Sequence, residues 1–169
     1  YFVTELDSER KLLDEISKYM PSEIISNEAF FMSGIDVADL RHRLGITIYS
    51  LESWYFGDDL AATTLKEHFH VASLDGLGLG DYNCGVIAAG SLLKYLYETQ
   101  KTTLDHMTTI EPYSTGKFMV LDSSTRRNLE LVETLREKQK RGSLLWVLDK
   151  TKTAMGARTL RSYLEQPLI

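Results

Sequence analysis

Short β-branched runs alternate with amphipathic helical patterns along the first hundred residues of the chain. The runs at 1–6, 22–26 and 46–51 have the length and composition of strands. The remaining segments repeat their apolar residues at helical spacing and lie at 8–20, 36–44, 58–69 and in the second half of 76–100. This alternation predicts an α/β domain in which helices cover a sheet.

Several single residues predict where these helices begin, end and pack. Gly45 is placed to close the helix at 36–44, because glycine favours the left-handed conformation that ends helices. Asp58 or Asp59 is expected to cap the next helix. The long helix within 76–100 carries a cluster of small residues, Gly85, Ala88, Ala89 and Gly90. We expect this cluster to let a neighbouring element approach the helix backbone closely.

The pattern changes after residue 100, and we place a domain boundary within about 101–112. Residues 101–121 are extended and β-branched around a turn, and the pattern from residue 123 onward is helical, interrupted by a charged bridge at 136–142. We therefore expect one α/β domain over 1–106. A second, mostly helical region is expected over 107–169.

The net charge of −5 is unevenly distributed. Residues 1–113 hold 8 Lys/Arg against 18 Asp/Glu, giving −10, while residues 114–169 hold 11 against 6, giving +5. An acidic domain is a poor ligand for a phosphate backbone, which requires neutralising cations. The tail cations are interleaved with Glu130, Glu133 and Glu137, as on a solvated face. A DNA-binding tail is nevertheless kept as one hypothesis.

Neither a membrane segment nor a leader is expected from the sequence. No apolar run approaches the roughly 20 residues of a membrane-spanning helix, and the opening YFVTEL has no basic n-region. The missing initiator Met and the stop just after Pro167 are typical of an excised fragment. The single cysteine, Cys84, excludes an internal disulfide and fits a reducing cytosol. Its small apolar neighbours predict that it is buried.

The glycine-rich stretch at 76–80 is not expected to cradle phosphates. A phosphate loop needs free backbone N–H groups at a helix start and a following Lys-Ser/Thr. Here no such pair follows, and we expect Asp81 to occupy the N–H groups itself. The dispersed histidines complete no zinc set. We therefore predict no catalytic, cofactor-binding or metal-binding residue in this chain.

An alternative hypothesis is an RNase H-like metal-dependent nuclease, because α/β folds of this kind include such enzymes. Two-metal chemistry needs several converging carboxylates. Glu5, Asp7, Glu28 and Asp36 lie near predicted strand ends or loops and are the candidates. Their spacing forms no recognised signature.

The most distinctive polar residues open the helical tail and form a candidate interdomain junction: Asp122, Arg126, Arg127 and Asn128. We expect Ser123 or Ser124 to cap a helix there, which places the two arginines in its first turn. Cations are disfavoured in that turn. The arginines are therefore expected to have partners on another element, as interdomain salt bridges or as a relay between domains.

Two further helices are expected in the tail. Trp146, in an apolar turn at 143–149, is expected to be a core anchor. Thr153 is a natural N-cap for the last helix, which Pro167 follows. Gly156 within that helix suggests close packing against a neighbour.

Several of these segments together resemble the MutS family of DNA mismatch-recognition ATPases. TRRNLEL at 125–131, VLD at 147–149, the T-x-T-x-MG-x-R pattern at 151–158 and R-x-x-L-x-x-PL at 161–168 match the entry into that family's core (lever) domain. PSEII and GLGLGDY, in the preceding part, are similar to its connector domain. The resemblance implies an RNase H-like connector over 1–106 that lacks its first strand. It also implies the N-terminal part of the core/lever domain over 107–169.

The resemblance further implies a non-catalytic segment of a bacterial, ATP-dependent mismatch-repair machine. In the full-length protein it implies ATP and Mg²⁺ as cofactors, with mismatched duplex DNA and a homodimer bound through regions outside this chain. Within the chain it implies a relay between mismatch-binding and ATPase domains and a contribution to docking MutL. A cytoplasmic, nucleoid-associated protein is expected. None of the family's chemical motifs occurs in this sequence, so no catalytic residue is transferred to it.

Overall fold

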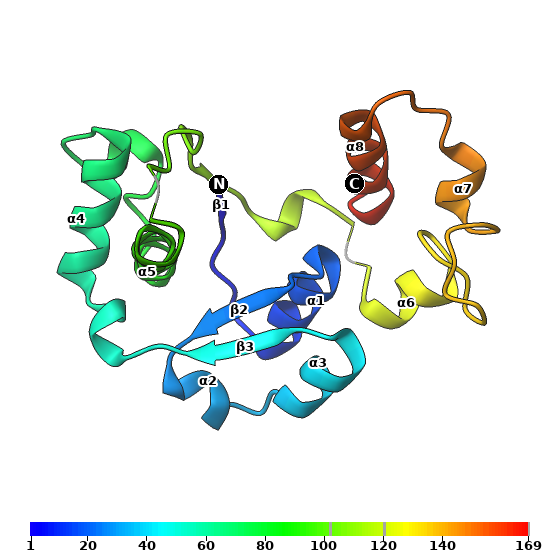
Figure 1. Cartoon of the computed structure of the whole chain (residues 1–169), viewed down its shortest axis with the longest axis horizontal. Coiled ribbons are helices and arrows are strands. Elements are labelled where there is room, and N and C mark those ends of the chain that lie inside the picture. The colour runs from blue at the N-terminus through cyan, green and yellow to red at the C-terminus, as the bar shows by residue number, and fades with distance from the viewer. Residues whose placement is uncertain (102, 120, 169) are drawn as a thin grey trace. The chain divides into compact units, whose positions relative to one another are not determined.

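The computed structural model describes residues 1–101, 103–119 and 121–168 (Figure 1). The described chain divides into two compact units. The first unit comprises Tyr1–Glu9 and Met20–Ser114, and the second comprises Arg10–Tyr19 and Thr115–Ile169. The backbone therefore crosses between the units three times.

Four described strands of the first unit pair in two separate parallel sheets. β2 (Glu23–Ser26) pairs with β3 (Thr47–Ser50), in a register that joins Glu23 to Thr47 and Ser26 to Ser50. β1 (Phe2–Val3) pairs with β4 (Glu111–Pro112). Parallel neighbours require a crossover, which helices supply between β2 and β3 (Figure 1). The α/β class is confirmed, whereas the strand predicted at 1–6 is limited to β1.

The helices of the first unit follow most of the predicted segments. They are α2 (Glu28–Met32), α3 (Val37–Leu44), α4 (Asp58–Phe69) and α5 (Cys84–Gln100), with short 3₁₀ turns η1 (Ser53–Phe56) and η2 (Leu74–Leu77). Gly45 ends α3 with φ 69°, as predicted. The predicted capping by Asp58 or Asp59 is wrong: Gly57 occupies the N-cap, and both carboxylates lie in the first turn, which favours anions.

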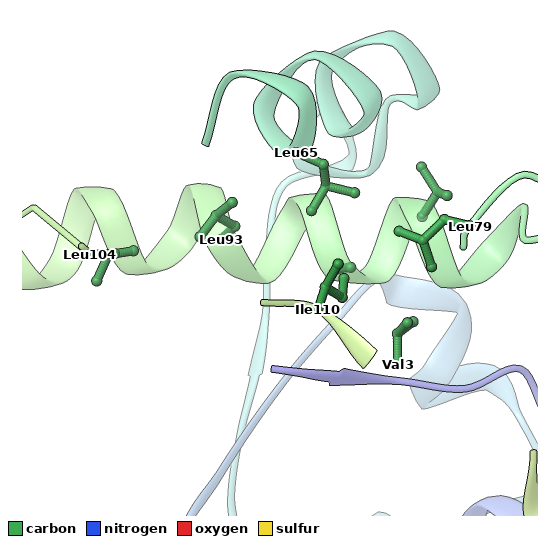
Figure 2. Close-up of a cluster of buried hydrophobic side chains, with 8 residues drawn as sticks. Val3, Leu65, Leu79, Leu93, Leu104 and Ile110 are labelled. Atoms are coloured by element: carbon green, nitrogen blue, oxygen red, sulfur yellow. The ribbon is translucent and has the colours of Figure 1, made fainter. Parts of the chain in front are cut away.

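The core of the first unit forms where α4, α5 and the flanking loops meet β1 (Figure 2). Its buried members are Val3, Leu65, Leu79, Val86, Ala89, Leu93, Leu104 and Ile110. Leu65, Leu79 and Leu93 are completely enclosed, at 0% exposure. A Cβ built on Gly90 would lie 2.6 Å from the carbonyl oxygen of Ala61, so α4 and α5 pack backbone to backbone. The close approach predicted for the small-residue cluster is confirmed at this position.

The second unit is built from short helices. α1 (Glu9–Tyr19) contributes Arg10–Tyr19, and the tail contributes η3 (Thr115–Lys117), α6 (Ser123–Asn128), α7 (Leu144–Leu148) and α8 (Ala154–Glu165). Leu131 and Leu145 are buried, and the Leu145 N–H donates to the Leu131 carbonyl at 2.8 Å. Phe118 and Leu168 form an isolated antiparallel bridge.

Three expectations about side chains in these elements are wrong. Trp146 is 48% exposed because five-residue α7 buries only Leu145, and the next residue along the helix points about 100° away from it. Cys84 is exposed because it is the first residue of α5, ahead of the buried face that begins at Gly85. Gly156 packs against its own cap, with Thr153 and Thr151 as the nearest neighbours, so its small size serves a local turn.

Candidate functional site

Asp122 fixes the start of α6. Its Oδ1 accepts a hydrogen bond from the Thr125 N–H at 2.6 Å, while its own backbone is extended, the usual N-cap geometry. The backbone hydrogen bond from Thr125 lowers the pKa of the Asp122 carboxyl, and the positive charge of Arg10 lowers it further. Because Asp122 is the N-cap, the predicted capping by Ser123 or Ser124 is wrong.

Arg126 and Arg127 lie in the last turn of α6, because this helix is only six residues long. The helix ends at Asn128, and Glu130 follows with a left-handed φ of 48°. The partial negative charge of a helix C-terminus favours cations. The electrostatic cost that the sequence suggested for these arginines is therefore absent.

The Arg126 guanidinium is only partly satisfied. Its Nε donates to the Leu121 carbonyl at 2.9 Å. Its Nη1 is buried and has no hydrogen-bond partner within 1–101, 103–119 and 121–168. A buried donor without an acceptor costs about 1–3 kcal/mol, more for a charged group. Arg126 can therefore donate one more hydrogen bond, from Nη1.

Arg126 lines a small cavity of about 80 Å³ inside the second unit. The cavity lies among the Arg10–Tyr19 part of α1, a stretch that includes residues 115, 118, 119 and 121, and the end of α8. Its lining residues are Lys11, Asp14, Glu15, Lys18, Thr115, Phe118, Met119, Leu121, Arg126, Glu165 and Gln166. Three regions distant in sequence therefore meet beside one guanidinium.

Three other charged residues at this cavity, Lys18, Glu15 and Glu165, are held in ion pairs. Lys18, only 6% exposed, donates to Glu15 Oε2 at 2.8 Å and lies 5.8 Å from the centre of the Phe118 ring. Glu165 pairs with Arg161 at 3.2 Å across one turn of α8. Burial of a lysine requires such pairing. These pairs hold their charges in place, whereas Arg126 Nη1 has no hydrogen-bond partner in the part of the chain that the structure describes.

Of the predicted junction residues, the structure places Asp122 and Arg126 together and leaves the other two at the surface. The Arg126 N–H donates to the Asp122 carbonyl at 3.0 Å. Arg127 and Asn128 are exposed at the end of α6. Lys18 and Glu15 are components that the sequence argument missed. The sequence signal that could have predicted this pair is a lysine on the apolar face of a helix with a glutamate three residues before it.

A second fixed point of the tail is Asp149, between α7 and α8. Its Oδ1 accepts from the Thr151 N–H at 3.1 Å and the Thr151 hydroxyl at 2.7 Å, and its Oδ2 pairs with Lys140. The Lys140 contact is the main cause that lowers the pKa of Asp149 to about 2. The Asp-x-Thr spacing is the sequence signal that could have predicted this turn.

Glu5, one of the carboxylates considered for metal chemistry, has a structural role. Glu5 Oε1 accepts from the N–H groups of Asn83 and Gly85, each at 2.7 Å, at the start of α5. Glu5 therefore occupies the position expected for Asp81. No group of three or more His, Cys, Asp or Glu able to hold a metal occurs among the described residues.

Family models match nearly the whole chain. The model for MutS domain II matches residues 1–108, and the model for MutS domain III matches residues 124–169. The chain belongs to the MutS family, with domain II followed by part of domain III.

Named relatives agree with this assignment. The chain is 65% identical over all 169 residues to the DNA mismatch repair protein MutS of Lachnoclostridium phytofermentans. It is 46% identical over 94% of its length to the protein of the same name from Ruminiclostridium cellulolyticum. It spans 18% of the length of each of these relatives.

The alternative hypothesis of a metal-dependent nuclease is not favoured by these matches. In the part of the chain that the structure describes, no helix is long and apolar enough to cross a membrane.

Proposed function

We propose that this chain is the segment of a MutS-type mismatch-repair protein that relays between its mismatch-binding and ATPase parts. Residues 1–106 serve as the connector and residues 107–169 as the beginning of the core/lever domain. The matched ranges, 1–108 and 124–169, support this division. The segment itself is non-catalytic. The whole protein binds mismatched duplex DNA as a homodimer, uses ATP and Mg²⁺ through other regions, and works in the cytoplasm at the nucleoid.

The observation that carries the relay is the threading of the chain between its two units. Tyr1–Glu9 belongs to the first unit, Arg10–Tyr19 to the second, Met20–Ser114 to the first and Thr115–Ile169 to the second. Two domains joined by one linker move freely by default. Three crossings tie a displacement of one unit to the backbone of the other at three points.

Arg126 is the residue through which we expect this coupling to act. It contacts the Leu121 carbonyl in the segment that follows the last crossing, and it faces the cavity where α1 and α8 meet. Its unpaired Nη1 is able to take an acceptor in one state of the machine and release it in another. Two discrete arrangements are what a relay requires.

The test is Arg126→Met in the full-length protein, which removes the charge and keeps most of the side-chain length. We expect mismatched DNA to stimulate ATP turnover at least threefold less than in the unchanged protein, with turnover in the absence of DNA preserved. Arg158→Met, an exposed arginine of α8, is the matched control. Unchanged mismatch stimulation in Arg126→Met, with a normal thermal transition, would refute the role of Arg126.

We further propose that the acidic part of the chain, residues 1–113, contributes to docking MutL. The support is its net charge of −10 and the exposed carboxylates on α4. Capture of the full-length protein by cognate MutL is the measurement, with Asp59→Lys and Glu67→Lys as reversals on α4 and equivalent reversals on α1. Capture unaffected by every one of these changes would remove this part of the proposal.

A further inference from the structure

A surface of the first unit combines exposed aromatic rings with fixed carboxylates. We define this aromatic–acidic surface by six residues: Glu23, Tyr49, Trp54, Tyr55, Tyr95 and Glu98. Trp54 is 52% exposed and Tyr49 is 49% exposed. Neither ring is needed for the buried core of this unit, which lies around Leu65 and Leu93. Large aromatic rings in water at one place mark an interaction site more often than a packing site.

The fold holds these residues together from four elements, with Glu23 on β2. Tyr49 lies on β3, Trp54 and Tyr55 form the following turn η1, and Tyr95 and Glu98 lie on α5. The completely buried Ser91 of α5 donates to the Tyr55 carbonyl at 2.8 Å, which fixes η1 on the helix. Trp54 stacks on Tyr55 with ring centres 3.9 Å apart. The surface is therefore formed before any partner arrives.

Each carboxylate of the surface is oriented by a tyrosine. Tyr95 donates its hydroxyl hydrogen to Glu23 at 2.5 Å, and Tyr55 donates to Glu98. The bond from Tyr55 lowers the pKa of Glu98, and the bond to Glu23 raises the pKa of Tyr95 to about 12. The first pair thus keeps the Tyr95 phenol protonated, and the second keeps the Glu98 carboxylate charged. Glu23 Oε2 has no hydrogen-bond partner within the described residues and remains able to accept one.

The chemistry of this surface selects a guanidinium group. A planar cation stacks on the face of Trp or Tyr and donates in its plane to carboxylates, which a lysine ammonium does less well. Lys94, which pairs with Glu98 at 3.3 Å, is the cation recorded at its edge. A phosphate backbone is excluded because the surrounding unit is acidic.

We propose that the aromatic–acidic surface docks a cationic segment of a partner protein through arginine side chains that stack on Trp54 and pair with Glu23 and Glu98. This inference deepens the docking role proposed above and rests on it. It specifies a place on the first unit, outside α1 and α4, and the side chain that is recognised.

The experiment measures binding of two labelled peptides, nona-arginine and nona-lysine, to the full-length protein by fluorescence anisotropy at fixed salt. The unchanged protein should bind the arginine peptide at least threefold more tightly than the lysine peptide. Trp54→Ala should weaken binding of the arginine peptide by about fivefold, because the aromatic face on which a guanidinium stacks is lost. The affinity of Trp54→Phe, which keeps a ring, should lie between those of the unchanged protein and Trp54→Ala. Glu98→Gln should weaken binding of the arginine peptide about as much as Trp54→Ala does.

Asp81→Asn is the matched control, because it removes one exposed carboxylate from the same acidic unit outside the surface and outside α4. It should change both affinities by less than twofold. Equal binding of the two peptides, or equal effects of Asp81→Asn and Glu98→Gln, would show that only net charge matters and would overturn the inference.

Capture by MutL separates this inference from the docking role. If Trp54→Ala weakens the arginine peptide but no surface change in the chain weakens MutL capture, the docking role fails and the recognition chemistry stands. If reversals on α4 weaken MutL capture but Trp54→Ala affects neither MutL nor the arginine peptide, the docking role stands and the aromatic–acidic surface is refuted.

Discussion

The two units of this chain differ in how completely they bury their own apolar residues. The first unit encloses Leu65, Leu79 and Leu93 fully between α4, α5 and the flanking loops (Figure 2). In the second unit α8 has no buried residue, and Trp146 on α7 is half exposed. Burial of apolar area is the main source of stability. The first unit therefore has its own core, whereas the second has amphipathic helices with much of their apolar surface still in water.

The largest effect is expected from shortening a buried side chain in the core of the first unit. Leu93→Ala should lower its free energy of unfolding by about 3 kcal/mol, since burial is complete and a cavity remains. Leu148→Ala in α7, a half-exposed leucine, should cost under about 1 kcal/mol. Urea unfolding of both variants makes the comparison. Equal losses would mean that the units do not differ in this respect.

A somewhat smaller effect is expected where α4 and α5 touch. Gly90→Ala should destabilise the first unit by about 2 kcal/mol, because the new methyl group overlaps Ala61. This sign opposes helix propensity, which favours Ala by about 1 kcal/mol. Ala88→Gly, at an exposed position of α5, measures the difference in helix propensity between Ala and Gly without a change in packing. A stabilised Gly90→Ala variant would contradict the backbone-to-backbone packing.

In the second unit a single cap should matter about as much as a single apolar contact. Thr153 Oγ1 accepts from the Gly156 N–H at 3.0 Å, and no buried side chain of α8 compensates for its loss. Thr153→Ala should cost about 1 kcal/mol. Thr153→Ser, which keeps the hydroxyl, should cost less. Circular dichroism during thermal unfolding compares the two variants. Equal transition temperatures would show that the Thr153 hydroxyl does not stabilise the start of α8.

The smallest effect we expect is a pH dependence confined to the second unit. Asp149 has a pKa of about 2, below its ordinary value of 3.8. Its contribution to stability is therefore complete above about pH 4 and is lost as the pH falls through 2. Asp149→Asn should remove this dependence. Carboxyl NMR shifts of Asp149 give its pKa directly, and a value near 3.8 would contradict the Lys140 and Thr151 contacts.

Local chemistry predicted several features of both units. The end of α3 at Gly45, the cap of α8 by Thr153 and the small-residue contact at Gly90 all followed from side chains within one or two turns. The cap on α5 did not, because Glu5 reaches it from 78 residues away. Such a contact has no short-range signal in the sequence.

The tail was harder to predict because the spacing of its apolar residues does not indicate which of them are buried. The pattern suggested a long first helix with Arg126 near its start, whereas α6 ends after six residues. Trp146 has the composition of a core residue but lies on an exposed face. The two arginines remain candidate junction residues, although their placement at the helix end reverses the electrostatic reason given for them. Their interdomain partners stay a prediction.

The threading of the chain also determines the order in which its parts can be completed during synthesis. Arg10–Tyr19 emerges from the ribosome early, yet the segment it packs with begins at Thr115, after the entire core of the first unit. The α1 segment must therefore wait about a hundred residues, roughly 5–20 seconds of elongation, for the rest of its unit. A fragment that starts after Tyr19 lacks one wall of the cavity beside Arg126, however its C-terminal boundary is chosen.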